Sequence, residues 1–104
     1  MRRKQIVAAV VASGLFVISA AGAAQNASIE RGRSLFSDPK LGTSGKTCST
    51  CHHGGKGLAK AAMNAELEST INACIAGPLK GKALDRDSAD MQSLVLYLKS
   101  LGGK

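Results

Sequence analysis

The longest apolar stretch of this chain lies within its first 24 residues, so the rest must fold around a small core of its own. Residues 1–4 carry three positive charges, residues 6–18 are almost entirely apolar, and residues 20–24 are all Ala or Gly. A basic start, an apolar stretch and small residues are typical of a secretory signal peptide. We therefore predict that residues 1–24 are cleaved on export. An uncleaved membrane anchor is the alternative, because the 19 residues of 6–24 approach the length that spans a bilayer.

The remainder, residues 25–104, is predicted to be one short domain with few large side chains. When 24 of the 104 residues are removed, 80 remain, and Phe36 and Tyr97 are the only aromatic residues among them. The 14 Lys and Arg residues fall to 11 against seven Asp and Glu residues, which gives a net charge of +4. Domains of this size bury only about 60% of their unfolded surface and usually need a disulfide, a metal or a cofactor. We expect such a group to complete the core.

The apolar pattern of the mature sequence predicts an all-α fold of three to four short helices. Ser28 can cap a first helix over residues 29–36. A second helix is predicted over residues 64–75, where apolar residues recur at helical spacing. The last helix begins at Ser88, carries its apolar residues on one face and ends before Gly102. No segment shows the alternation of a β-strand.

The most informative motif is Cys48-Ser49-Thr50-Cys51-His52, in which two thiols lie three positions apart and a histidine follows directly. Thiols at this spacing can add to the two vinyl groups of one haem, and the histidine is then held as the proximal iron ligand. Haem attachment to such a motif takes place outside the cytoplasm, which agrees with an exported chain. We therefore predict one covalent haem c, bound through Cys48 and Cys51 with His52 on the iron. A haem also supplies the large apolar group that the small core lacks.

Three other interpretations of the cysteines remain open. A zinc site could combine Cys48, Cys51 and Cys74 with His52 or His53, although such sites usually take their ligands as two close pairs and Cys74 stands alone. A dithiol redox motif normally begins a helix within a strand–helix–strand unit, and no strand is predicted here. A disulfide between the first two cysteines would close a very short loop and stabilise the chain little. Outside a zinc site, His53 is expected to be an exposed loop residue.

Together these features resemble a small class I cytochrome c with a single haem, over residues 29–101. The resemblance rests on Gly32 and Phe36 in the first predicted helix, on the two-cysteine motif and on the ending LVLYLKSL at residues 94–101. The first and last helices of that family cross closely, which implies that Gly32 and Phe36 pack against Tyr97. The residue types agree with this crossing, because glycine has no Cβ to hold two helix axes apart.

The sixth iron ligand is where the chain departs from that family. Class I cytochromes normally supply a methionine from the loop before the last helix, and residues 77–87 contain none. Cys74 and Met91 are therefore the candidate distal ligands. Residues 71–74 and the spaced glycine, leucine and methionine after them are similar to the cytochrome domains of thiosulfate dehydrogenases and related sulfur-oxidation cytochromes, in which the matching cysteine ligates the iron. The alternatives are an inert buried thiol for Cys74, core packing for Met91, and Met63 as a third candidate ligand.

The resulting expectation is a periplasmic one-electron carrier rather than an enzyme. An acidic redox partner is favoured by six lysines in or near the loops around the predicted haem edge, namely Lys40, Lys46, Lys56, Lys60, Lys80 and Lys82. Nucleic acid binding is not expected, because no basic stripe with interleaved aromatics is present, and no membrane contact is expected after signal cleavage. The alternatives are a haem-containing sulfur-compound oxidoreductase, or a subunit of one, with Cys74 as iron ligand, and then a zinc-binding module.

Overall fold

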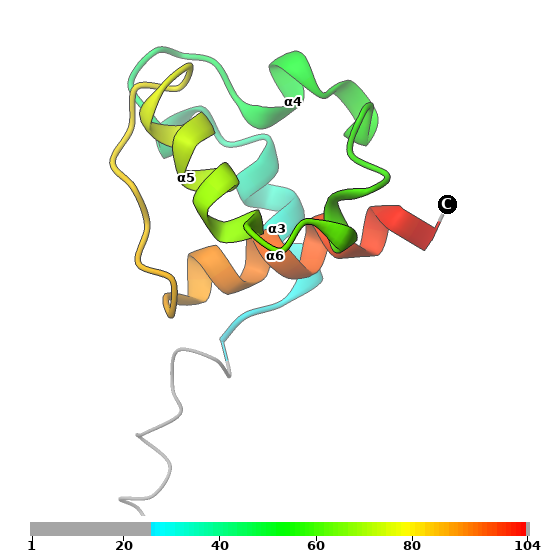
Figure 1. The fold of residues 1–104 in the computed structure, drawn as a ribbon. Coiled ribbons are helices and arrows are strands. Elements are labelled where there is room, and N and C mark those ends of the chain that lie inside the picture. Colours follow the sequence, from blue (N-terminus) through cyan, green and yellow to red (C-terminus); the bar gives the residue numbers. More distant parts are fainter. Residues whose placement is uncertain (1–25, 104) are drawn as a thin grey trace, which may run out of the picture.

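The protein is all-α over residues 26–103, the part of the chain that the computed structural model describes, so the all-α part of the fold prediction is confirmed there. The main helices are α3, α5 and α6, with the short α4 apart from them (Figure 1). Their bounds are Ile29–Phe36 for α3, Cys48–Cys51 for α4, Leu67–Ala76 for α5 and Ala89–Ser100 for α6. Short 3-10 turns are formed by Pro39–Leu41 (η2), His53–Gly55 (η3), Ala61–Met63 (η4) and Leu101–Gly103 (η5).

The predicted signal peptide, residues 1–24, lies outside the described residues. Within residues 26–103, every helix is too short or too polar to cross a membrane.

Side-chain caps set where the helices begin. Ser28 and Ser88 each accept a hydrogen bond from the backbone N–H three residues further on, at 2.9 Å and 3.1 Å. The predicted cap at Ser28 and the predicted start of the last helix at Ser88 are therefore confirmed. Helix α5 begins at Leu67, three residues later than predicted, because Asn64 forms a turn before it. The Asn64 side-chain oxygen accepts the N–H of Glu66 at 2.8 Å, and its carbonyl accepts the N–H of Leu67 at 3.2 Å.

Helices α3 and α6 cross at Gly32, which lies directly against the backbone of Ser93. A Cβ on Gly32 would overlap the Ser93 carbonyl and would lie 2.7 Å from the Cβ of Tyr97. One turn along α3, the ring of Phe36 packs edge-on against that of Tyr97, with centroids 5.2 Å apart. The buried Ser93 hydroxyl accepts the N–H of Ser28 at 3.0 Å, so this polar group is satisfied within the crossing. The predicted packing of Gly32 and Phe36 on Tyr97 is confirmed.

The hydrophobic core is arranged around a cavity. Its buried apolar residues are Phe36, Leu67, Ile71, Ile75, Leu79, Met91, Leu94, Val95 and Leu98. Six of these nine also line a cavity of about 400 Å³, namely Phe36, Leu67, Ile71, Leu79, Leu94 and Leu98. The buried apolar side chains of α5 and α6 therefore pack in the core and also line one shared cavity.

Replacing Gly32 with alanine tests whether the α3–α6 crossing depends on this close approach. We expect Gly32→Ala to lower the free energy of unfolding by about 1–3 kcal/mol, because the new methyl group must push the two backbones apart. Ser34→Ala is the matched control, since Ser34 is an exposed residue of the same helix. Urea unfolding followed by circular dichroism measures both. Equal stabilities of the two variants would contradict the packing described here.

Candidate functional site

Cys48, Cys51 and His52 share one face of a single helical turn. Helix α4 spans the two cysteines, and His52 follows as its C-cap, with its N–H donating to the Cys48 carbonyl at 2.9 Å. A capping box begins the turn: the N–H of Thr50 donates to the Thr47 hydroxyl at 3.2 Å, and the N–H of Thr47 donates to the Thr50 hydroxyl at 2.8 Å. Residues three and four positions apart lie on the same side of a helix. The sequence motif thus becomes a local cluster of two thiols and one imidazole.

The loop after α4 fixes the ring of His52. Its Nδ1 lies 2.9 Å from the carbonyl oxygen of Lys56. A carbonyl can only accept a hydrogen bond, so Nδ1 carries the proton and Nε2 of the neutral imidazole has the free lone pair. Gly54 and Gly57, with φ of 65° and 83°, adopt the left-handed conformation that lets this short loop turn back toward the ring. Histidines that bind metals commonly donate their second ring N–H in this way.

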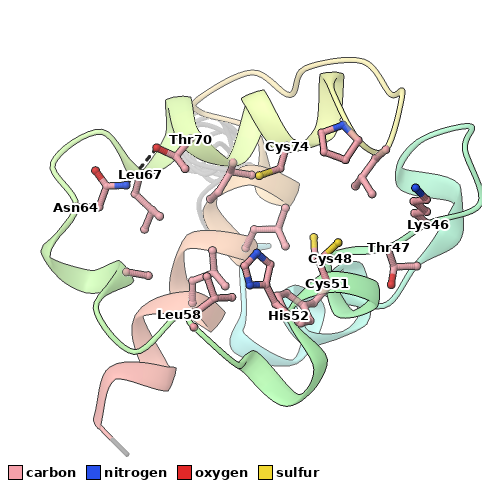
Figure 2. Close-up of a pocket in the computed structure, with 18 of the residues that line it drawn as sticks. Lys46, Thr47, Cys48, Cys51, His52, Leu58, Asn64, Leu67, Thr70 and Cys74 are labelled. Carbon is pink, nitrogen blue, oxygen red and sulfur yellow. Dashed lines mark hydrogen bonds between the residues drawn. The ribbon is translucent and has the colours of Figure 1, made fainter.

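These three side chains line the same cavity as Cys74 (Figure 2). The cavity wall is mainly apolar, and Cys74 reaches it from α5, between the buried residues Ile71 and Ile75. Cys74 is exposed, so the alternative of an inert buried thiol is wrong. All three cysteines are free thiols. The fold therefore brings together the local motif and a third thiol from a distant part of the chain.

Burial raises the pKa of the Cys48 thiol above its ordinary value. The nearby Cys74 thiol adds to this increase, a hydrogen bond from the Cys48 backbone opposes it, and Cys51 adds a smaller increase. Cys48 therefore remains a protonated thiol at neutral pH.

The other candidate ligands lie elsewhere. Met91 is fully buried in the core and does not line the cavity, in keeping with its alternative role in packing. Met63 is 78% exposed and also lies outside the cavity wall. His53 is exposed, as its position beside His52 predicts. Of the three candidate distal ligands, only Cys74 reaches the cavity.

The ligand set of a zinc site is not assembled in this arrangement. Over residues 26–103, no group of three or more His, Cys, Asp or Glu side chains is placed to hold one metal ion. Zinc needs four ligands at about 2.0–2.3 Å in a tetrahedron. Cys48, Cys51, His52 and Cys74 instead surround a space much larger than one ion.

The charged residues of the cavity wall are all basic. The six lysines expected near the haem edge are exposed, and two of them, Lys46 and Lys60, line the cavity. Among residues 26–103, no Asp or Glu lines it. Asn64 and Thr70 also belong to the wall, and sequence reasoning missed both. In the sequence they form a pair of polar residues at the start of a predicted helix, and such a pair indicates helix capping as readily as ligand binding.

Comparison with known proteins leaves the site to be interpreted from its own geometry. The chain matches no protein-family model, no curated protein and no solved structure.

Asn72, two residues before Cys74, attaches the loop before α6 to α5. Its side-chain amide donates to the Leu84 carbonyl at 2.9 Å, and its side-chain oxygen accepts the Leu84 N–H at 2.8 Å. We expect Asn72→Ala to lower the free energy of unfolding by about 2 kcal/mol, because two partly buried backbone groups lose their partner. The exposed Ser69 of the same helix provides the control, and Ser69→Ala should change stability by less than about 0.5 kcal/mol. A denaturant titration in which both variants behave alike would show that Asn72 does not hold this loop.

Proposed function

We propose that the protein is a monohaem c-type cytochrome of the periplasm that carries single electrons between redox partners. The observation that carries the proposal is the hydrogen bond from His52 Nδ1 to the Lys56 carbonyl, 2.9 Å long. It leaves Nε2 as the only ring atom able to bind a metal, on a side chain that shares its cavity with Cys48 and Cys51. A histidine that only packs against its neighbours would have no need for a protonated Nδ1 and a free Nε2 beside two thiols.

The size and chemistry of the cavity fit a haem. Its volume of about 400 Å³ lies within the range of cofactor pockets, and its wall is mainly apolar with a few polar groups. An apolar disc would cover the facing surfaces of Leu67, Ile71, Leu94 and Leu98. The two cavity-lining lysines suit a ligand that carries negative charge at its edge.

Each residue then has a defined task. The thiols of Cys48 and Cys51 would each add across one vinyl group, forming a carbon–sulfur bond, and each thiol proton would go to the other vinyl carbon. His52 would bind the iron through Nε2, and its hydrogen bond to the Lys56 carbonyl would hold the ring in place and increase its basicity. The haem supplies a reversible one-electron change at its iron.

Cys74 is the distal ligand that we assign within this proposal. Among the candidates it alone lines the cavity, whereas Met91 fills the core. A thiolate donates electron density to the iron and lowers its reduction potential, whereas a methionine ligand raises it. The carrier would therefore operate at a lower potential than a cytochrome with histidine and methionine ligands.

The second candidate function is a haem-containing sulfur-compound oxidoreductase, or a subunit of one. The position of Cys74 in the cavity wall favours it, because a thiol there could meet a sulfur substrate. Electron transfer is the better-supported function, because the haem would occupy the space in which a substrate has to bind. Turnover of thiosulfate by the purified protein would decide for the second function.

The exposed lysines favour acidic partners for the carrier. All six lie on loops or short turns rather than on α3, α5 or α6. Two haem carboxylates would reduce the mature charge from +4 to about +2, so the attraction would be local and sensitive to salt.

Replacing both motif cysteines tests haem attachment. The chain is exported from a host that attaches haem outside its cytoplasm, and the purified protein is examined by optical spectroscopy and intact mass. We expect the unaltered protein and the control Ser49→Ala to be red and to carry one covalent haem. The double variant Cys48→Ala/Cys51→Ala should lose the covalent haem completely, because no thiol of the motif remains. A colourless unaltered protein that contains zinc would instead support the zinc-binding module.

A comparison of Cys74→Ala with Met91→Leu identifies the distal ligand. We expect Cys74→Ala to change the optical spectrum and to raise the reduction potential, because the thiolate is lost. Met91→Leu should leave both unchanged and should cost less than about 1.5 kcal/mol of stability, since leucine nearly conserves the core volume. If the spectrum responds to Met91→Leu and not to Cys74→Ala, the assignment of Cys74 is wrong.

A further inference from the structure

The wall of the cavity has an uneven distribution of charge. Lys46 and Lys60 line it, whereas no Asp or Glu does. Within residues 26–103, the acidic residues that form ion pairs are Asp90 and Glu68, and their partners are arginines outside the cavity. Neither lysine therefore has a carboxylate partner in the described part of the chain. An anionic ligand group would provide one.

The two lysines belong to different ends of the cavity. Lys46 lies two residues before Cys48, at the end where the thiols are. Lys60 and Asn64 flank the short turn η4 as its N-cap and C-cap residues. Figure 2 shows Asn64 on one side of the His52 ring, and Lys46 with the two motif cysteines on the other. Only Lys60 is therefore grouped with Asn64 at the end away from the thiols.

The Asn64 amide is oriented by its neighbours and keeps one free donor. Its side-chain oxygen accepts the Glu66 N–H at 2.8 Å, and its Nδ2 donates to the Thr70 hydroxyl at 3.1 Å. That hydroxyl donates to the Glu66 carbonyl at 3.0 Å, so its own proton is already used. An amide NH₂ group has two hydrogens. The second N–H of Asn64 therefore has no acceptor among the described residues.

We propose that Lys60 and Asn64 bind the two carboxylate groups of the haem, an assignment that rests on the proposed function. A haem carries its vinyl groups and its carboxylates at opposite parts of its rim. With the vinyl groups bonded to Cys48 and Cys51, the carboxylates belong at the end of the cavity away from the thiols. The ammonium of Lys60 and the free N–H of Asn64 supply the charge-assisted hydrogen bonds that carboxylates need. Lys46, at the thiol end, does not take part.

Resonance Raman spectroscopy of the haem-loaded protein tests this assignment, because the bending vibrations of the haem carboxylates respond to hydrogen bonding. The variants are Lys60→Gln and the matched control Lys46→Gln, which removes the same charge from the same cavity wall. We expect the carboxylate bending bands to shift in Lys60→Gln and to stay in place in Lys46→Gln. Asn64→Asp should also shift them, because it places a carboxylate where an N–H donor was. Lys60 and Asn64 are exposed, and Asn64→Asp keeps a side-chain oxygen for the Glu66 N–H, so we expect these variants to retain the fold.

Several results would overturn the assignment. Unchanged bands in both Lys60→Gln and Asn64→Asp would show that neither side chain binds the carboxylates. A shift in Lys46→Gln alone would place the carboxylates at the thiol end. In both cases the proposed function is unaffected if the variant retains its covalent haem and its optical spectrum is unchanged. A protein without haem would overturn the proposed function as well.

Discussion

The cavity inside the core is the constraint on which the rest of this structure depends. Six of the nine core residues line it, so the helices that carry them are held apart at the cavity and do not fill it with their own side chains. The wall of the cavity is mainly apolar, so an empty cavity leaves apolar side chains in contact with water. A group that covered this wall would add to the stability of the fold, and the proposed haem would do so.

The two sides of the cavity depend on different parts of the fold. The thiols of Cys48 and Cys51 and the imidazole of His52 are arranged by one helical turn, its capping box and the Gly-rich loop, all within a few residues. Cys74 reaches the same space only because α5 packs across the core and its following loop is attached through Asn72. The positions of Cys48, Cys51 and His52 are thus set by local structure, whereas the position of Cys74 requires the complete tertiary fold. Changes in the core would therefore move Cys74 before they disturb the turn that carries Cys48, Cys51 and His52.

The sequence predicted much of the fold, because its signals were local. Ser28 was identified as a cap and Ser88 as the start of the last helix, and the missing side chain of Gly32 agreed with the crossing of α3 and α6 that the family resemblance implied. The start of α5 was placed too early, since the turn formed by the Asn64 side chain resembles a first helical turn in sequence. The sequence also left both Cys74 and Met91 as candidates, because the two residues share helical stripes with core residues. Only the packing of the helices separates a thiol that reaches the cavity from a methionine that fills the core.

The central claim is that residues 48–52 hold a haem covalently, and the mass of one peptide tests it most directly. Trypsin cleaves after Lys46 and Lys56 and so releases residues 47–56, which contain the whole motif and exclude Cys74. In the protein exported from a host that attaches haem, this peptide should carry the mass of one haem and should have no thiol that reacts with an alkylating reagent. A peptide of unmodified mass with two reactive thiols would contradict the account.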